Sequence, residues 1–155
     1  MKEIRNWHDL NAVRGGPNDS YVLLNDLCSK TEGYEECAGR AADEGKRWKP
    51  IGNDDEPFTG SFDGRDHRIC DLFISRLDGD CIGLFDVVRK DVEAREKGKR
   101  GRGKIKNVGV VRANISGNTC VGALAGVYEQ NVTIRNCYST GRVRDNNIVG
   151  GHCRK

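Results

Sequence analysis

The sequence has few proline, methionine and aromatic residues: 3 Pro, 1 Met and 6% aromatics in 155 residues. The low proline content excludes collagen and Pro-rich linkers. The low methionine and aromatic contents argue against a Met-rich binding groove or a large aromatic surface. No apolar run approaches the roughly 18 residues of a membrane-spanning helix, and the segment Met1–Trp7 does not resemble a signal peptide. We therefore expect a cytosolic protein or a piece of a longer secreted chain, with no membrane span.

The chain has 7 cysteines, an odd number, and no two of them are spaced CxxC. This spacing argues against a zinc ribbon or a thioredoxin-like site, so we expect no metal and no cofactor. Charge is divided unevenly along the chain. Residues 1–88 carry 11 Lys/Arg against 18 Asp/Glu, and residues 89–155 carry 15 against 5. The basic second half is thus a candidate for anion binding.

The strongest signal is an internal repeat. Three blocks share isoleucine, a variable residue, Asp or Asn, and then an apolar residue: Ile69–Ile74, Ile105–Val110 and Ile134–Ser139. A second set follows them: Cys81–Phe85, Cys120–Leu124 and Ile148–His152.

The spacing of these blocks is close to 28 residues, apart from one longer interval. Ile105 and Ile134 are 29 residues apart, whereas Ile82 and Val121 are 39 apart. We assign the additional residues of the longer interval to the basic stretch 89–104. Units this short cannot bury their own apolar face, and short alternating runs between Gly or Asn turns are typical of strands. The sequence therefore predicts an all-β fold, a parallel β-solenoid.

The N-terminus has a helical pattern instead. Asn6 can cap a helix with Asp9 three residues later, and Trp7, Leu10 and Val13 then share one face. We expect this short helix to cover the open end of the solenoid. Further along, residues 21–24 are expected to form the first strand, and residues 29–47 a long loop that can include a helical turn.

Several segments together resemble the GLUG-repeat family of bacterial and archaeal surface and adhesin-like proteins. They are Tyr21–Leu27, Trp48–Gly52, Phe58–Gly64, Gly83–Phe85, Asn107–Val110 and Asn136–Gly141. The resemblance implies a right-handed parallel β-helix, an extracellular or cell-surface location, and a structural, adhesive role with no catalytic residues to carry over. Two residues depart from the family pattern. Asp86 stands where the family usually has glycine, and His152 occupies a position of the repeat that is otherwise apolar.

We divide the single expected domain into a helical cap (1–16), first coils (17–85), a basic inserted loop (86–104) and GLUG-like coils (105–155), the last of them incomplete. An incomplete last coil allows end-to-end self-association. A surface polysaccharide or another protein is the expected partner.

Two acidic segments have alternative interpretations. Asp63, Asp66 and His67 can serve acid–base chemistry in a carbohydrate-active β-helix, or simply form an Asp-Gly turn. The acidic stretch 53–56 can bind Ca²⁺ or form a solvated loop. We favour the turn and the loop, and hence a protein that is not an enzyme.

The basic stretch and two cysteines are the remaining candidates. The stretch can bind a polyanion, and no aromatic side chain interrupts it to stack on bases, so specific nucleic-acid binding is not expected. Cys81 and Cys120 occupy the same repeat position, where they form either a stack of small apolar residues or a disulfide. The candidate polyanion-binding residues are Arg95, Lys97, Lys99, Arg100, Arg102 and Lys104.

Overall fold

The computed structural model describes residues 1–53, 55–89, 104–117, 119–128, 132–144 and 153–154. Strands predominate, and helices are few and short. The helical segments are α1 (Trp7–Asn11), η1 (Ala12–Gly15), α2 (Tyr34–Cys37) and η2 (Ala42–Gly45). The strands are β1 (Lys2–Ile4), β2 (Ser20–Leu23), β3 (Ser61–Asp63), β4 (Arg68–Cys70), β5 (Phe73–Ser75), β6 (Asp80–Ile82), β7 (Phe85–Val88), β8 (Lys104–Lys106), β9 (Gly109–Ser116), β10 (Thr119–Val121), β11 (Ala125–Tyr128), β12 (Thr133–Arg135), β13 (Tyr138–Arg144) and β14 (Cys153–Arg154).

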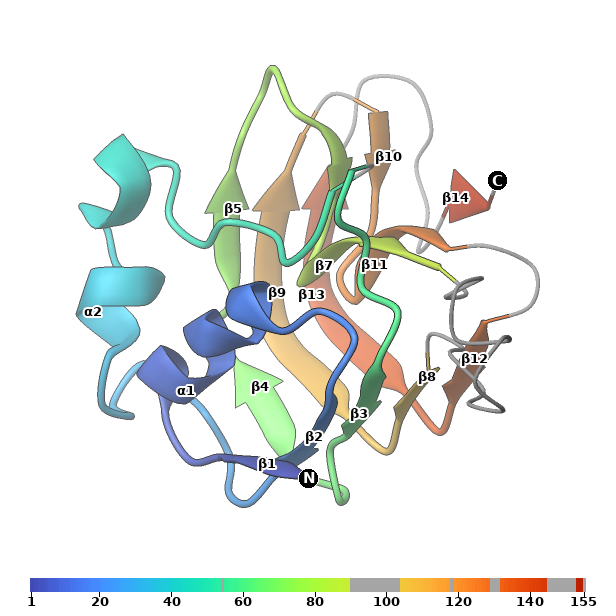
Figure 1. The fold of residues 1–155 in the computed structure, drawn as a ribbon. Helices are drawn as coiled ribbons and strands as arrows, with labels where there is room; N and C mark the ends of the chain where they lie inside the picture. The colour runs from blue at the N-terminus through green and yellow to red at the C-terminus, as the bar shows by residue number, and fades with distance from the viewer. Residues whose placement is uncertain (54, 90–103, 118, 129–131, 145–152, 155) are drawn as a thin grey trace.

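The strands form parallel sheets, which agrees with the predicted all-β fold (Figure 1). One five-stranded sheet has the order β1-β2-β3-β8-β12, which we call sheet A. A second sheet, sheet B, has the order β13-β9-β4, with β5 also paired to β9. The third has the order β14-β11-β7, and β10 pairs with β6 in a fourth. All of these strand pairs are parallel.

Helix α1 begins where the sequence predicts. The Asn6 side chain accepts a hydrogen bond from the Asp9 amide at 2.8 Å, which satisfies one of the unpaired donors of the first turn. Trp7, Leu10 and Val13 are all fully buried, so their shared face packs into the core. One expectation here was wrong. Residues 21–24 do not hold the first strand, because β1 precedes α1 and pairs with β2.

The register of the sheets repeats along the chain. Ile105 lies opposite Ile134 in sheet A, and Ile115 lies opposite Val143 in sheet B. The separations in sequence are 29 and 28 residues. The predicted 39-residue interval is also confirmed, since Ile82 lies opposite Val121. Consecutive stretches of chain therefore place equivalent strands side by side.

One alignment of the repeat was wrong. The block at Ile69 does not lie beside the block at Ile105, because Phe62 pairs with Ile105 and Ile69 pairs with Val110. The cause is that similar residues begin strands of two different sheets. The Ile69 block begins on β4 of sheet B, whereas the Ile105 block begins on β8 of sheet A.

The core changes in character along the chain. The N-terminal part buries large aromatic rings, and the Phe58 and Phe62 rings contact that of Phe85 at centroid distances of 4.7 and 5.7 Å. The strands from β8 to β11 bury aliphatic side chains and alanine. Ile134 and Val143, on β12 and β13, are only partly buried. Hydrophobic burial thus weakens toward the C-terminal strands described.

Candidate functional site

The turns that follow the sheet A strands repeat in conformation and in chemistry. Asn107 follows β8 and Asn136 follows β12, with φ of 57° and 54°. Asparagine adopts this left-handed region more readily than most residues do. The Asn136 side chain donates to Asn107 Oδ1 at 3.1 Å, and the Asn107 side chain donates to Asp63 Oδ1 at 3.2 Å. We call these three residues the amide ladder. The Ile-x-Asn blocks already indicated the two asparagines in the sequence.

Asp63 belongs to this ladder. Its carboxylate also accepts the Arg65 amide at 2.9 Å and lies 3.9 Å from the Lys106 ammonium. Burial alone raises the pKa of Asp63, but the Arg65 amide, Asn107 and Lys106 outweigh it, and the pKa falls below its usual value. Asp63 is thus held ionised within a turn.

The other two candidate catalytic residues have different surroundings. Asp66 is exposed, with φ of 65°. His67 Nδ1 lies 3.4 Å from Asp26 Oδ1, so the partner of His67 comes from a distant segment. Asp26 in turn accepts the Arg68 amide at 2.8 Å, which is the main reason its pKa is lowered. These contacts tie the segment 63–68 to neighbouring segments in the manner of a structural turn.

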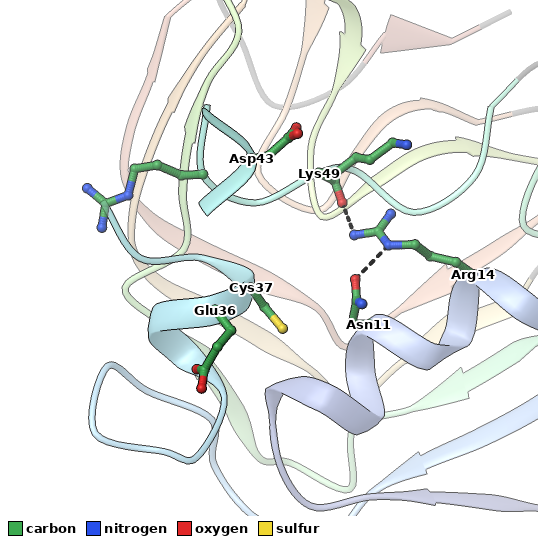
Figure 2. A pocket seen from close by; sticks show the side chains of 7 residues that line it. Asn11, Arg14, Glu36, Cys37, Asp43 and Lys49 are labelled. Carbon is green, nitrogen blue, oxygen red and sulfur yellow. Dashed lines mark hydrogen bonds between the residues drawn. The ribbon is translucent and has the colours of Figure 1, made fainter. Parts of the chain in front are cut away.

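A cavity of about 360 Å³ lies beside α1 and α2 (Figure 2). Arg14 forms one wall, and its guanidinium donates to Asn11 and to the backbone carbonyl of Lys49. Burial, together with the nearby Arg76, lowers the pKa of Arg14 to about 10. The cavity is lined by Asn11, Arg14, Glu36, Cys37, Asp43, Arg47 and Lys49.

Arg14 and Asp43, which line this cavity, have partners elsewhere in the protein. Arg14 also donates to the Pro50 carbonyl at 2.7 Å and lies 4.9 Å from the centre of the Trp48 ring. Asp43 accepts a hydrogen bond from Arg76, and this bond is the main cause of its lowered pKa. Arg14 therefore links α1 to the segment around Trp48. Sequence reasoning missed this role, because nothing in the pattern places Arg14 beside that ring.

The acidic stretch 53–56 forms a tight turn at its described residues. The Asn53 side chain accepts the amides of Asp55 and Glu56 at 2.8 and 2.7 Å. Asp54 lies outside the described residues. Over the part of the chain that the structure describes, no group of three or more His, Cys, Asp or Glu side chains is arranged to hold a metal ion.

Most of the predicted polyanion site lies outside the described residues. This applies to Arg95, Lys97, Lys99, Arg100 and Arg102, and also to the repeat block 148–152. Lys104 is described and begins β8, where its side chain is half-buried. The basic stretch therefore leads directly into sheet A.

Cys81 and Cys120 have matching positions on β6 and β10. The neighbouring pairs Asp80–Thr119 and Ile82–Val121 place the two cysteines opposite each other. Both residues have positive φ, 61° and 52°. The shared repeat position is thus reproduced in the structure, and the choice between a stack and a disulfide stays a prediction.

Comparison with known proteins finds a family match over part of the chain. Residues 117–144 match the GLUG motif, a segment that contains β10, β11, β12 and β13. Halomucin of Haloquadratum walsbyi is 34% identical over 96% of this chain. A Gly-rich membrane protein of Evansella cellulosilytica is 46% identical over 28% of it.

The chain spans 2% of the length of halomucin and 5% of the length of the Gly-rich membrane protein. No solved structure matches. Among the described helices, none has the length and apolar character needed to cross a membrane. The match at residues 117–144 confirms the predicted family resemblance: the chain carries a GLUG motif at these residues.

Proposed function

We propose that the chain is a non-catalytic structural repeat module of a larger surface protein, in which parallel strands wind as coils of a right-handed β-helix. The observation that carries this proposal is the shared register of successive strands. Ile105 and Ile134, Val110 and Ser139, and Ile115 and Val143 lie opposite each other at separations of 28–29 residues. A separation that strands of two sheets share is what two stacked neighbouring coils produce. Other steps are longer, since Phe62 and Ile105 are 43 residues apart and Ile82 and Val121 are 39 apart. Parallel connections are right-handed in most proteins, which supports the handedness.

Helix α1 acts as the cap at the N-terminal end of this solenoid. Its buried Trp7 ring contacts the Trp48 and Tyr34 rings at 5.7 and 5.3 Å. A cap of this kind covers apolar side chains that the first coil leaves without a neighbour. The whole chain, 1–155, then forms one solenoid domain whose basic stretch is an insertion between coils.

The relatives support a place at the cell surface. One of them is halomucin and the other a Gly-rich membrane protein, and each is far longer than this chain. A long chain of stacked modules suits a spacer or adhesive surface, and its strand edges allow end-to-end contact with a further module. The partners of Asp63 and His67 support a non-catalytic module, since these side chains are engaged with Asn107 and Asp26.

Surface labelling tests this function. Intact cells that make the protein are treated with a membrane-impermeant amine-reactive biotin reagent, and the peptides of this chain are identified by mass spectrometry. Lys30, which is exposed, is a suitable reporter. We expect Lys30 to be labelled on intact cells as strongly as after lysis, with a cytosolic protein as the negative control. Labelling that requires lysis would contradict the proposal.

A further inference from the structure

The outward face of sheet A has an unusual charge distribution at its β3–β8–β12 end. Phe62 and Ile105 are fully buried, so the residues on either side of them point away from the core. The register places these outward residues in two columns across the strands. One column is Ser61, Lys104 and Thr133, and the other is Asp63, Lys106 and Arg135. We call this surface the outer face.

The outer face carries more positive charge than its own acid can neutralise. Lys106 lies 3.9 Å from Asp63, the single acid of the two columns. Within the described residues, the side chains of Lys104 and Arg135 form no hydrogen bond or ion pair. Arg112 on sheet B differs, because it forms two hydrogen bonds with Asp71. Positive charge on the outer face is therefore available to a ligand.

The outer face is also hollowed beside these cations. A cavity of about 160 Å³ is lined by Met1, Ser61, Phe62, Asp63, Lys104 and Lys106. It brings the Ser61 hydroxyl of β3 together with the Lys104 and Lys106 ammonium groups of the adjacent strand β8. Adjacent strands lie about 4.8 Å apart in a sheet. The Asp63 carboxylate also lines the hollow, where Lys106 offsets its charge and Lys104 is left over. A carboxylate or sulfate group can accept hydrogen bonds from all three donors. Arg135, on the next strand, extends the positive charge beyond the hollow.

We propose that the outer face binds a linear acidic polysaccharide, with one carboxylate or sulfate in the hollow and the next acidic group near Arg135. This proposal adds a binding activity to the structural function proposed above, and it places anion binding on sheet A. The chemistry favours a polysaccharide over a single-stranded nucleic acid. The two columns contain no aromatic ring on which a base can stack, whereas sugar hydroxyls can bond to Ser61 and Thr133.

Isothermal titration with defined probes tests the proposal. The probes are polygalacturonate and heparin as acidic polysaccharides, dextran as a neutral one, and oligothymidine as a nucleic acid. The protein is compared with Lys106→Gln/Arg135→Gln and with the control Arg142→Gln/Arg144→Gln, which removes the same charge from β13 in sheet B. A third variant, Lys97→Gln/Lys99→Gln/Arg100→Gln, removes three positive charges from the basic stretch.

We expect the protein to bind at least one acidic polysaccharide, with an affinity that falls as salt is added, and not to bind dextran. The outer-face variant loses about tenfold in affinity, while the sheet B control changes by less than about threefold, since two charge contacts are lost in the first and none in the second. The basic-stretch variant retains binding.

Four results would overturn the proposal: no binding of either polysaccharide, equal losses in both double variants, loss confined to the basic-stretch variant, or oligothymidine bound as tightly as the polysaccharides. Thermal unfolding of each variant shows whether a loss of binding reflects a loss of fold. The scaffold function is tested separately by surface labelling, so that the failure of one proposal leaves the other standing.

Discussion

Replacement of Ile105 by alanine tests whether adjacent strands share one core. Ile105 is fully buried and lies between Phe62 and Ile134 in the register of sheet A. Truncation of a buried isoleucine to alanine costs about 2–5 kcal/mol, as lost burial plus the cavity that remains. Since Ile105 has a neighbouring strand on each side, we expect Ile105→Ala to lower the free energy of unfolding by about 3–4 kcal/mol.

Ile134→Ala is the matched control. Ile134 occupies the same column but is only partly buried, so its truncation removes less contact area. We expect a cost of about 1–2 kcal/mol, below that of Ile105→Ala. Urea unfolding followed by the fluorescence of the buried Trp7 and Trp48 measures both costs. Equal losses in the free energy of unfolding for the two variants, or no loss for Ile105→Ala, would refute the stacking of Ile105 between Phe62 and Ile134 in one core.

Three further predictions concern the turns and corners. At Asn107, with its positive φ and ladder bonds, Asn107→Leu should destabilise more than Asn107→Gly by about 1–2 kcal/mol in urea unfolding, because glycine keeps the left-handed conformation; equal effects would contradict this. The hydrogen bonds from Arg112 are the main reason that the pKa of Asp71 lies below its usual value. Stability from this pair is therefore complete above the unfolded pKa of about 3.9 and is lost as pH falls through the folded pKa. The gap in stability between the protein and Asp71→Asn should thus close in acid titrations, and a pH-independent gap would argue against the pair. Mild oxidation should join Cys81 to Cys120, because the register sets them opposite each other on adjacent strands. Peptide mapping by mass spectrometry detects the bond, and its absence would favour the alternative stack of small side chains.

Sequence patterns predicted much of the fold because they report local chemistry. The Asn6 cap and the apolar face of Trp7, Leu10 and Val13 follow from helix geometry alone, and all of these features are present. The 29-residue step from Ile105 to Ile134 was also visible, since no insertion interrupts it.

Register across irregular turns was beyond the same reasoning. Ile69 and Ile105 begin similar blocks, but Ile69 lies on β4 and pairs with Val110, whereas Ile105 lies on β8 and pairs with Phe62. A strand as short as β1 gives no periodic signal, so its pairing with β2 was missed.

The candidate sites were less predictable than the fold. Arg14 is held in position by hydrogen bonds to the backbone carbonyls of Lys49 and Pro50, which are 35 and 36 positions away in the chain. The outer face of sheet A likewise depends on which strands become neighbours, and composition alone showed only that the second half of the chain is basic. Long-range pairing of this kind is decided by the packing of the whole core.

Nuclear Overhauser effects across the strands of the folded protein test the central claim most directly. The account predicts contacts between the amide and α protons of β8 and β12 with Ile105 opposite Ile134, and of β9 and β13 with Ile115 opposite Val143. Parallel cross-strand contacts in this register would establish that two neighbouring coils stack strand on strand in both sheets. Antiparallel contacts, or a register displaced by even one residue, would contradict the account.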